Sequence, residues 1–311
     1  MEVWLQLLVN GISIGAVYAL FALGYTLVFS VLGVINFAHG AVFTCGAYFT
    51  YIFLGGVVGS NGLLATQKLP VTFPLAIALV LAGLTAAMVG LLVETVAFKP
   101  LRRRGAEPLL YLITSLGAGV IIVNLIQLLM GAEAYALPSN ILGSMPAVLA
   151  LGHGIQIRTV QLLLLLVGGV TMLILNIWLN QSLSGKALQA VAEDTTTARL
   201  LGINSGTMIQ LAFAIASFLA GLSGGLVALS VNIGGPYFGI SYGLKGLGVL
   251  VLGGLGSVPG AMLGGLIIGI TEAFVPAKLS AYKDAVAFAF LFLVLIIRPQ
   301  GLFGKPPIEK V

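Results

Sequence analysis

The stretch SGKALQAVAEDTTTARLLGINSG, residues 184–206, decides how the remaining sequence is interpreted. It is the longest segment that combines charge with helix-forming residues, and apolar sequence flanks it on both sides. In a helix, one side would carry a row of small and apolar residues: Ala187, Leu188, Val191 and Ala192. The stretch therefore predicts an amphipathic helix outside the membrane.

A second short helix is predicted directly after the first. Asp194 or Thr195 would cap its start, because their side-chain oxygens can accept hydrogen bonds from free backbone amides. Gly202 is the natural stop, because glycine readily adopts the left-handed conformation that ends helices. Two short helices that meet at an angle, each joined to a spanning helix, would transmit motion applied by a protein outside the bilayer.

The composition places the chain in a membrane. Of 311 residues, 59% are hydrophobic and only 7% are charged, against roughly 25% charged residues in soluble proteins. The formal charge of +5 does not indicate nucleic-acid binding, because the basic residues are spread over several short loops. A single cysteine, Cys45, excludes an internal disulfide and an all-cysteine metal site. The first ten residues lack the features of a cleaved signal peptide and are expected to remain in a span.

The apolar segments predict an all-α polytopic membrane protein with one transmembrane domain, residues 1–311. About eight hydrophobic segments are expected, at 5–31, 40–59, 70–97, 109–130, 159–180, 207–230, 244–271 and 284–297. The uncharged link 33–40 would break a helix at membrane depth, which is tolerated only where backbone faces protein or water.

Glycines interrupt the seventh segment in the run GGLGSVPG, residues 253–260. Gly254, Gly256 and Gly260 predict a helix break or a close-packed corner, and hinges in a gate are the alternative. Glycines four residues apart elsewhere, such as Gly11 and Gly15, predict close packing between helices.

The basic residues predict the orientation of the chain. They collect in 99–104, at Lys186 with Arg199, and in the tail 298–311, and such clusters favour the cytoplasmic side. The charge-poor segment 131–158 is then an external loop. If the tail is cytoplasmic, 244–271 must enter and leave on one side, or otherwise not cross as one straight helix. This arrangement would leave three lysines external: Lys245, Lys278 and Lys283.

Polar groups inside spans are costly and therefore indicate function or specific support. Six are candidates for a substrate pathway, with support of a broken helix or interhelical hydrogen bonding as the alternative: Tyr18, Tyr25, Asn36, His39, Asn124 and Gln127. Glu94 and Glu272 lie near span ends, where an interfacial, solvated position is expected.

The sequence contains no catalytic constellation. The two histidines have no metal-ligand spacing, and there is no phosphate-binding loop for ATP. No chain of buried carboxylates suggests a proton or sodium relay, so energy for pumping would have to arrive from outside the bilayer.

Several runs resemble one family, the LivH-type permeases of branched-chain amino acid ABC importers. They are GAVYAL at 15–20, GVINFAHG at 33–40, AED at 192–194 with LGIN at 201–204, GGLGSVPGA at 253–261, and the ending from YKD at 282–284 to the last residue. This chain departs from the pattern at Ala41, where the family commonly has an acidic residue. No role of that carboxylate carries over.

The resemblance implies a type II-like ABC importer permease in the bacterial inner membrane. It implies four kinds of partner: a LivM-type sister permease, two ATPase subunits that bind ATP and Mg²⁺, a periplasmic substrate-binding protein, and membrane lipid. The chain itself would be no enzyme and would hold no cofactor or metal.

By the same resemblance, 184–206 is the cytoplasmic loop that couples the permease to an ATPase. The coupling residues would be Ala187, Leu188, Val191, Glu193, Asp194, Ala198, Arg199, Leu201 and Gly202. Two alternatives remain at this point: a related urea or amide ABC importer, and an ion-coupled secondary transporter or channel that works without ATPases.

Overall fold

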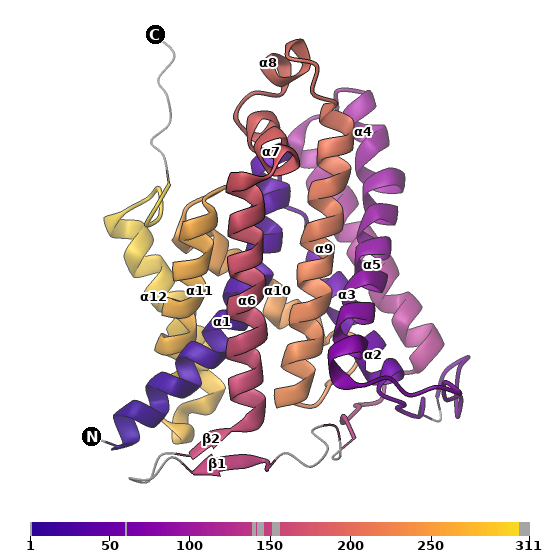
Figure 1. The fold of residues 1–311 in the computed structure, drawn as a ribbon, viewed down its shortest axis with the longest axis vertical. Helices are drawn as coiled ribbons and strands as arrows, with labels where there is room; N and C mark the ends of the chain where they lie inside the picture. The colour runs from indigo at the N-terminus through magenta and orange to yellow at the C-terminus, as the bar shows by residue number, and fades with distance from the viewer. Residues whose placement is uncertain (1, 60, 139–140, 142–145, 151–155, 305–311) are drawn as a thin grey trace.

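The computed structural model describes residues 2–59, 61–138, 141, 146–150 and 156–304, and most of these are helical (Figure 1). Five helical stretches of the described chain are long and apolar enough to cross a bilayer. They are α1 (Glu2–Leu32), α3 (Leu75–Val93) continued through a π-helical turn (Glu94–Phe98) and α4 (Lys99–Arg103), α5 (Pro108–Met130), α6 (Thr159–Gln181) and α9 (Ser205–Ser230).

Four apolar helices are shorter than a full span: α2 (His39–Phe53), α10 (Phe238–Gly253), α11 (Val258–Ala273) and α12 (Lys283–Ile297). Each has 15 or 16 residues, or roughly 24 Å at about 1.5 Å per residue, against a hydrocarbon core of about 30 Å. The all-α polytopic prediction is confirmed. The expected second segment, 40–59, is too long, because its helix ends at Phe53.

The predicted break between the first two segments is confirmed. His39, the first residue of α2, stacks on Phe21 at 4.8 Å between ring centroids, and Phe21 lies in the middle of α1. The chain therefore turns back into the bundle before α2 begins. Two backbone amides in this turn have side-chain partners. The Asn36 side-chain oxygen accepts a hydrogen bond from the Ala38 amide at 3.1 Å, and the Ser115 hydroxyl accepts one from the Phe37 amide at 3.1 Å. This satisfies the requirement that irregular backbone at membrane depth has protein partners.

The glycine-rich segment forms a helical hairpin. Residues 254–257 separate α10 from α11, and Gly254 and Gly256 have φ angles of +102° and +81°, which favour glycine. Gly253 and Gly260 face each other so closely that a Cβ on Gly260 would lie 2.0 Å from the Gly253 carbonyl oxygen. The prediction that this segment does not cross as one straight helix is confirmed.

Glycines also allow the long helices to approach one another. A Cβ on Gly15 would lie 2.9 Å from the Leu266 backbone of α11, and one on Gly46 of α2 would lie 2.3 Å from Gly221 of α9. Close backbone contact of this kind takes the place of a hydrophobic driving force in lipid. It holds α1, α2, α9 and α11 as the centre of the bundle.

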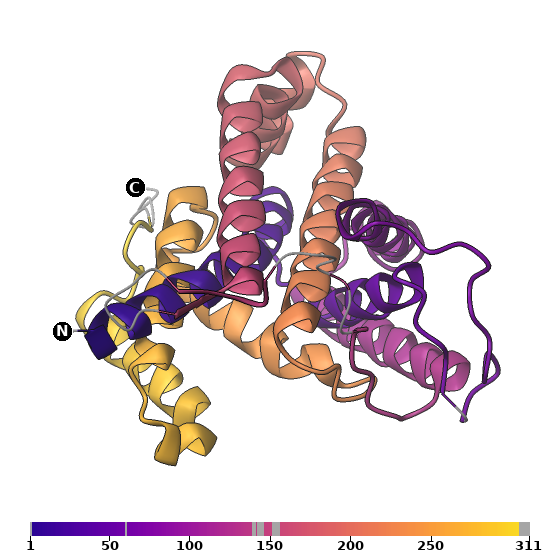
Figure 2. The same ribbon diagram turned by 60° about the horizontal axis from the view of Figure 1, so that its bottom comes forward.

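The two ends of the bundle differ (Figure 1). Helices α4, α7 (Leu183–Glu193) and α8 (Thr195–Leu200) lie at one end. The other end carries the N-terminus and the antiparallel strands β1 (Val148–Ala150) and β2 (Gln156–Arg158). Figure 2 shows α6 and α9 leading to the α7–α8 end and α12 at the edge of the bundle. The predicted loop 131–158 thus lies opposite the predicted coupling loop, although part of it falls outside the described residues.

Candidate functional site

The α7–α8 pair forms as the sequence predicts and packs on the bundle. The Asp194 carboxylate accepts from the Thr196 amide at 2.8 Å and the Thr197 amide at 3.3 Å, which caps α8. Leu188, Val191 and Ala198 are 2%, 1% and 1% exposed. These apolar side chains anchor the pair to its own chain. The expectation that they contact a partner is therefore wrong for this structure.

The outer surface of the pair carries other apolar residues. Leu183, Leu200 and Leu201 are 89%, 84% and 74% exposed, although they lie outside the spanning helices. The remaining predicted coupling residues, Ala187, Glu193, Asp194, Arg199 and Gly202, are exposed or half-buried. These leucines therefore belong to the outer surface of the pair and not to its core.

The α7–α8 pair also lies beside the glycine corner. A cavity of about 540 Å³ is lined by Glu193 of α7, Ser30 at the end of α1, Asn180 of α6 and residues 255–259. Gly256 lines this cavity, whereas Gly254 is packed against Gly304. The glycine corner is thus packed closely against the C-terminal segment. This agrees with the interpretation of these glycines as a close-packed corner.

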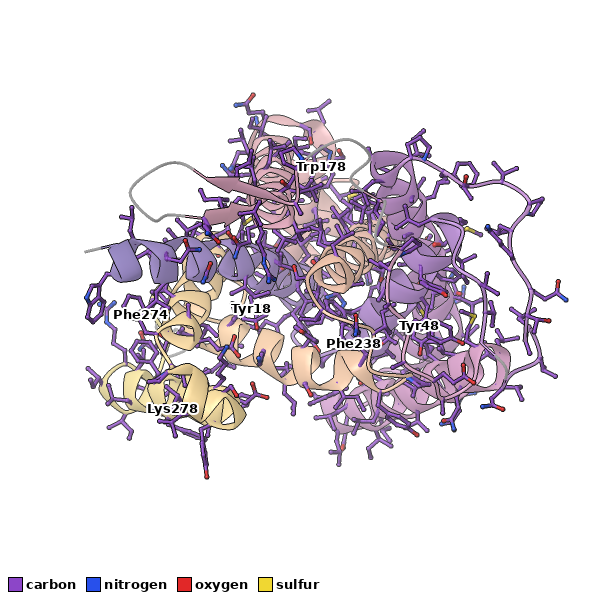
Figure 3. The ribbon with its side chains drawn as sticks, turned by 90° about the horizontal axis from the view of Figure 1, so that it is seen from below. Tyr18, Tyr48, Trp178, Phe238, Phe274 and Lys278 are labelled. Atoms are coloured by element: carbon purple, nitrogen blue, oxygen red, sulfur yellow. The ribbon has the colours of Figure 1, made fainter. Side chains whose placement is uncertain are left out.

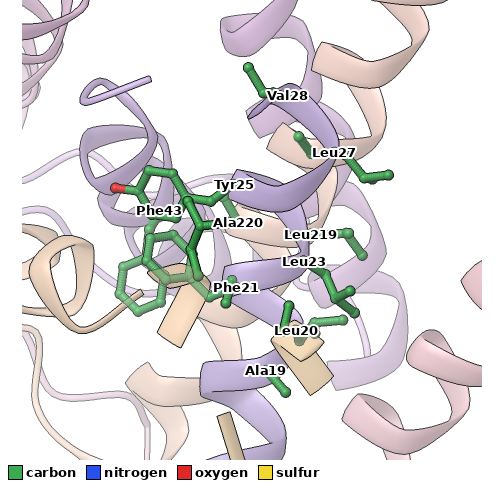
Figure 4. Close-up of a cluster of buried hydrophobic side chains, with 14 of the residues drawn as sticks. Ala19, Leu20, Phe21, Leu23, Tyr25, Leu27, Val28, Phe43, Leu219 and Ala220 are labelled. Carbon is green, nitrogen blue, oxygen red and sulfur yellow. The ribbon is translucent and has the colours of Figure 1, made fainter. Parts of the chain in front are cut away.

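A second group lies inside the bundle. The rings of His39, Phe21 and Tyr25 are in mutual contact, with centroids 4.4 to 5.3 Å apart, and Figure 4 shows Tyr25 beside Phe43 on one side of α1. Tyr25 is 2% exposed, and its hydroxyl has no hydrogen-bond partner among the described residues. Tyr25 also lines a cavity of about 280 Å³ between α1, α2, α5 and α10.

The six predicted pathway residues do not form one site. Tyr25 and His39 lie together, and Asn36 supports the turn before α2. Asn124 and Gln127 are exposed on α5, where they line a shallow cavity with Asn61.

Tyr18 belongs to a separate cluster that the sequence analysis missed. Its hydroxyl donates to Glu272 at 2.6 Å, and Lys245 pairs with Glu272 and, at 2.9 Å, with Asp284. Lys245 and Glu272 side chains are 10% and 7% exposed, and Figure 3 shows Tyr18 between α1 and α10. The prediction of a solvated Glu272 is therefore wrong, and Lys245 lies largely buried beside it. The sequence did contain a signal for this pair. Lys245 and Glu272 have opposite charges and lie in neighbouring apolar segments, where an isolated charge is costly.

Glu94 is also buried rather than solvated. Its side chain is 0% exposed and pairs with Arg102 at 2.7 Å across the π-helical turn, with Gln210 of α9 at 3.4 Å. The pair joins α4 to α9 just before the α7–α8 end.

A bundle of long and broken apolar helices, with an amphipathic helix pair outside it, defines a polytopic membrane permease. Comparison with known proteins gives the family. The chain belongs to the family described as branched-chain amino acid transport system / permease component, which matches residues 7–295. The predicted resemblance is confirmed.

Two relatives show how far the similarity extends. The chain is 38% identical to the high-affinity branched-chain amino acid transport system permease protein LivH of Escherichia coli, over 99% of this chain and 98% of the relative. It is equally similar to the corresponding permease protein BraD of Pseudomonas aeruginosa, again over 99% and 98%. No solved structure matches the chain.

Proposed function

We propose that this chain is the membrane-spanning permease subunit of an ATP-driven importer for branched-chain or other hydrophobic, neutral amino acids. It receives substrate from a periplasmic binding protein and is coupled to cytoplasmic ATPases through residues 184–206. The names of the LivH and BraD relatives support the substrate class. A LivM-type sister permease completes the pathway, and two ATPase subunits bind ATP and Mg²⁺.

The observation that carries the coupling role is the two-sided α7–α8 pair. Its inner side is fixed to the bundle through Leu188 and Val191, while Leu200 and Leu201 project from it almost fully exposed. A partner that binds these leucines can move the pair only together with the bundle. ATP-driven closure of the partners would then shift the permease toward the state that the closed ATPases bind better.

The arrangement of charge supports an α7–α8 end in the cytoplasm. The basic residues of 99–104, Lys186 and Arg199 all belong to this end, and basic loops favour the cytoplasmic side. The C-terminal segment joins them, since the Leu302 and Phe303 amides donate to backbone carbonyls at the end of α10. We infer that the coupling loop and the C-terminus are cytoplasmic and that the N-terminus and 131–158 are external, in the bacterial inner membrane.

The coupling role is tested with a double variant, Leu200→Asp and Leu201→Asp, in the complete complex. Both side chains are exposed, so the fold should persist, while the charged surface should release the ATPases. Co-purification from native membranes and amino-acid uptake measure the effect. Thr196→Asp on the same helix is the matched control, because it adds charge at an exposed polar position. Normal ATPase retention by the double variant would contradict the coupling role.

The substrate class is tested by uptake of leucine, isoleucine, valine, alanine and urea with the complete complex. Transport of urea but of no amino acid would assign the chain to the sibling importers. Uptake by the purified chain without ATPases would contradict an ATP-driven mechanism.

A further inference from the structure

The small cavity at Tyr25 has the features of a ligand site, and it opens to the outside of this chain between α5 and α10, where Val120 and Leu244 are 61% and 51% exposed. Its volume of about 280 Å³ lies just below the range of about 300–1,000 Å³ found for ligand cavities. Most of its wall is aliphatic and comes from two helices: Leu116, Val120 and Val123 of α5, and Ile240, Leu244 and Leu247 of α10. No charged side chain lines it among the described residues. A small ligand with a branched aliphatic group fits such a wall.

The polar side of the cavity is formed by the starts of two helices. Gly40 and Ala41 belong to the first turn of α2, and Tyr237 and Ile240 lie at the start of α10. The backbones meet closely, since a Cβ on Gly239 would lie 2.1 Å from the Gly40 carbonyl oxygen. Helix starts carry a partial positive charge and favour an anionic group. Broken helices in transporters place such starts at carboxylates of their substrates.

The Tyr25 hydroxyl is an independent sign of a ligand. The residue is 2% exposed, lines the cavity, and has no hydrogen-bond partner among the described residues. Its oxygen lies 3.5 Å from where a Cβ of Gly243 would be, and Gly243 also lines the cavity. The oxygen is not among the enclosed polar atoms that lack a partner, so it is open to the cavity and free to donate to a ligand there. A ligand carboxylate would supply the missing acceptor.

We propose that this cavity binds the transported amino acid, with its carboxylate at Tyr25 and the start of α2 and its aliphatic side chain between α5 and α10. Tyr25 binds the group that all amino acids share. Gly243 and Gly119 line the cavity near its carboxylate end, and a methyl group at either position would leave less room for the ligand's side chain between α5 and α10. This inference rests on the proposed function and adds to it the place in this chain where substrate size is sensed.

Two glycine positions allow a sharp test of the size limit. Gly243→Ala adds a methyl group beside Tyr25, and its nearest neighbours would be 3.5 Å away, so the backbone need not move. Gly248→Ala makes the same change on the same helix, but it faces Leu291 of α12 at 3.4 Å, away from the cavity. The second pair of variants is on α5. Gly119→Ala narrows the cavity, and Gly117→Ala is its control, because a Cβ at Gly117 would have no neighbour within 4 Å.

The experiment measures uptake of leucine and alanine, in competition, by the complete complex with its own binding protein. The binding protein is the same for every variant, so a change in the ratio of leucine to alanine uptake reflects a change in the permease. Gly243→Ala and Gly119→Ala should each lower the preference for leucine over alanine by about tenfold, since one methyl group alters selectivity of an apolar pocket by that order. Gly248→Ala and Gly117→Ala should keep the wild-type ratio.

Tyr25→Phe keeps the ring contacts and removes only the hydroxyl. It should raise KM about tenfold for leucine and alanine alike, with the ratio unchanged. Equal ratios for the cavity variants and their controls, with uptake intact, would overturn this inference and leave the proposed function standing. Unchanged selectivity with altered lipid co-purification would likewise overturn it and assign the cavity to an acyl chain. Absence of ATP-driven amino-acid uptake by the wild-type complex would overturn both.

Discussion

The buried ion pair between Lys245 and Glu272 allows a quantitative prediction about stability. Replacement of Lys245 by Met leaves the Glu272 carboxylate, 7% exposed, with Tyr18 as its remaining partner. Removal of one member of a buried pair costs about 3–5 kcal/mol, because the other charge stays buried without compensation. Glu272→Gln should cost less, about 1–3 kcal/mol, since Lys245 keeps Asp284. Asp284 is 53% exposed, so Asp284→Asn should cost at most about 1 kcal/mol.

The assay is thermal unfolding of the purified chain in lipid nanodiscs. With roughly 2 °C lost per kcal/mol for a chain of this size, Lys245→Met should lower the apparent Tm by about 6–10 °C and Asp284→Asn by about 2 °C or less. The double variant Lys245→Met with Glu272→Gln should recover most of the loss, because no buried charge remains. A Lys245→Met variant that melts like wild type, or a double variant worse than either single one, would refute the reasoning.

Two further substitutions test the packing of the bundle. Arg102→Met leaves Glu94 fully buried without its cation and should cost about 3–5 kcal/mol in the same unfolding assay. Arg103→Met, at the neighbouring exposed position, should have little effect. Equal losses of stability in the two variants would contradict the pairing of Arg102 with Glu94. Gly46→Ala should cost about 1–3 kcal/mol, because its Cβ would lie 2.3 Å from the Gly221 backbone and would force α2 and α9 apart; an unchanged Tm would contradict this close approach.

Local signals in the sequence were sufficient for the features that depend on neighbours in the chain. Asp194 caps α8 and Gly202, at φ +83°, follows its end, because capping and left-handed turns involve only adjacent residues. The break at Asn36 was predicted for the same reason, since an amide side chain between apolar segments can satisfy nearby backbone. Glycine spacing in 253–260 likewise predicted that α10 and α11 are separate.

Features that depend on which helices meet could not be predicted in this way. Lys245 and Glu272 are 27 residues apart, and their pairing requires that α10 and α11 fold back at a particular register. Tyr18, from α1, joins them across 254 residues of sequence. No local pattern encodes that distance, so the sequence alone could not pair Lys245 with Glu272 and Tyr18. The cavity at Tyr25 is likewise visible only once α1, α2, α5 and α10 are placed together.

The α7–α8 pair shows that an amphipathic pattern identifies the apolar face of a helix but not what that face packs against. The row of Leu188 and Val191 predicted a contact surface, and that surface is covered by the same chain. Leu200 and Leu201 follow no helical period because they end α8, yet they are the leucines left exposed. This division suits the proposed coupling role, since a flexible loop with exposed leucines would absorb an applied displacement. A pair fixed through its inner face, beside the corner 255–259, would pass that displacement to α6, α9 and the α10–α11 hairpin together.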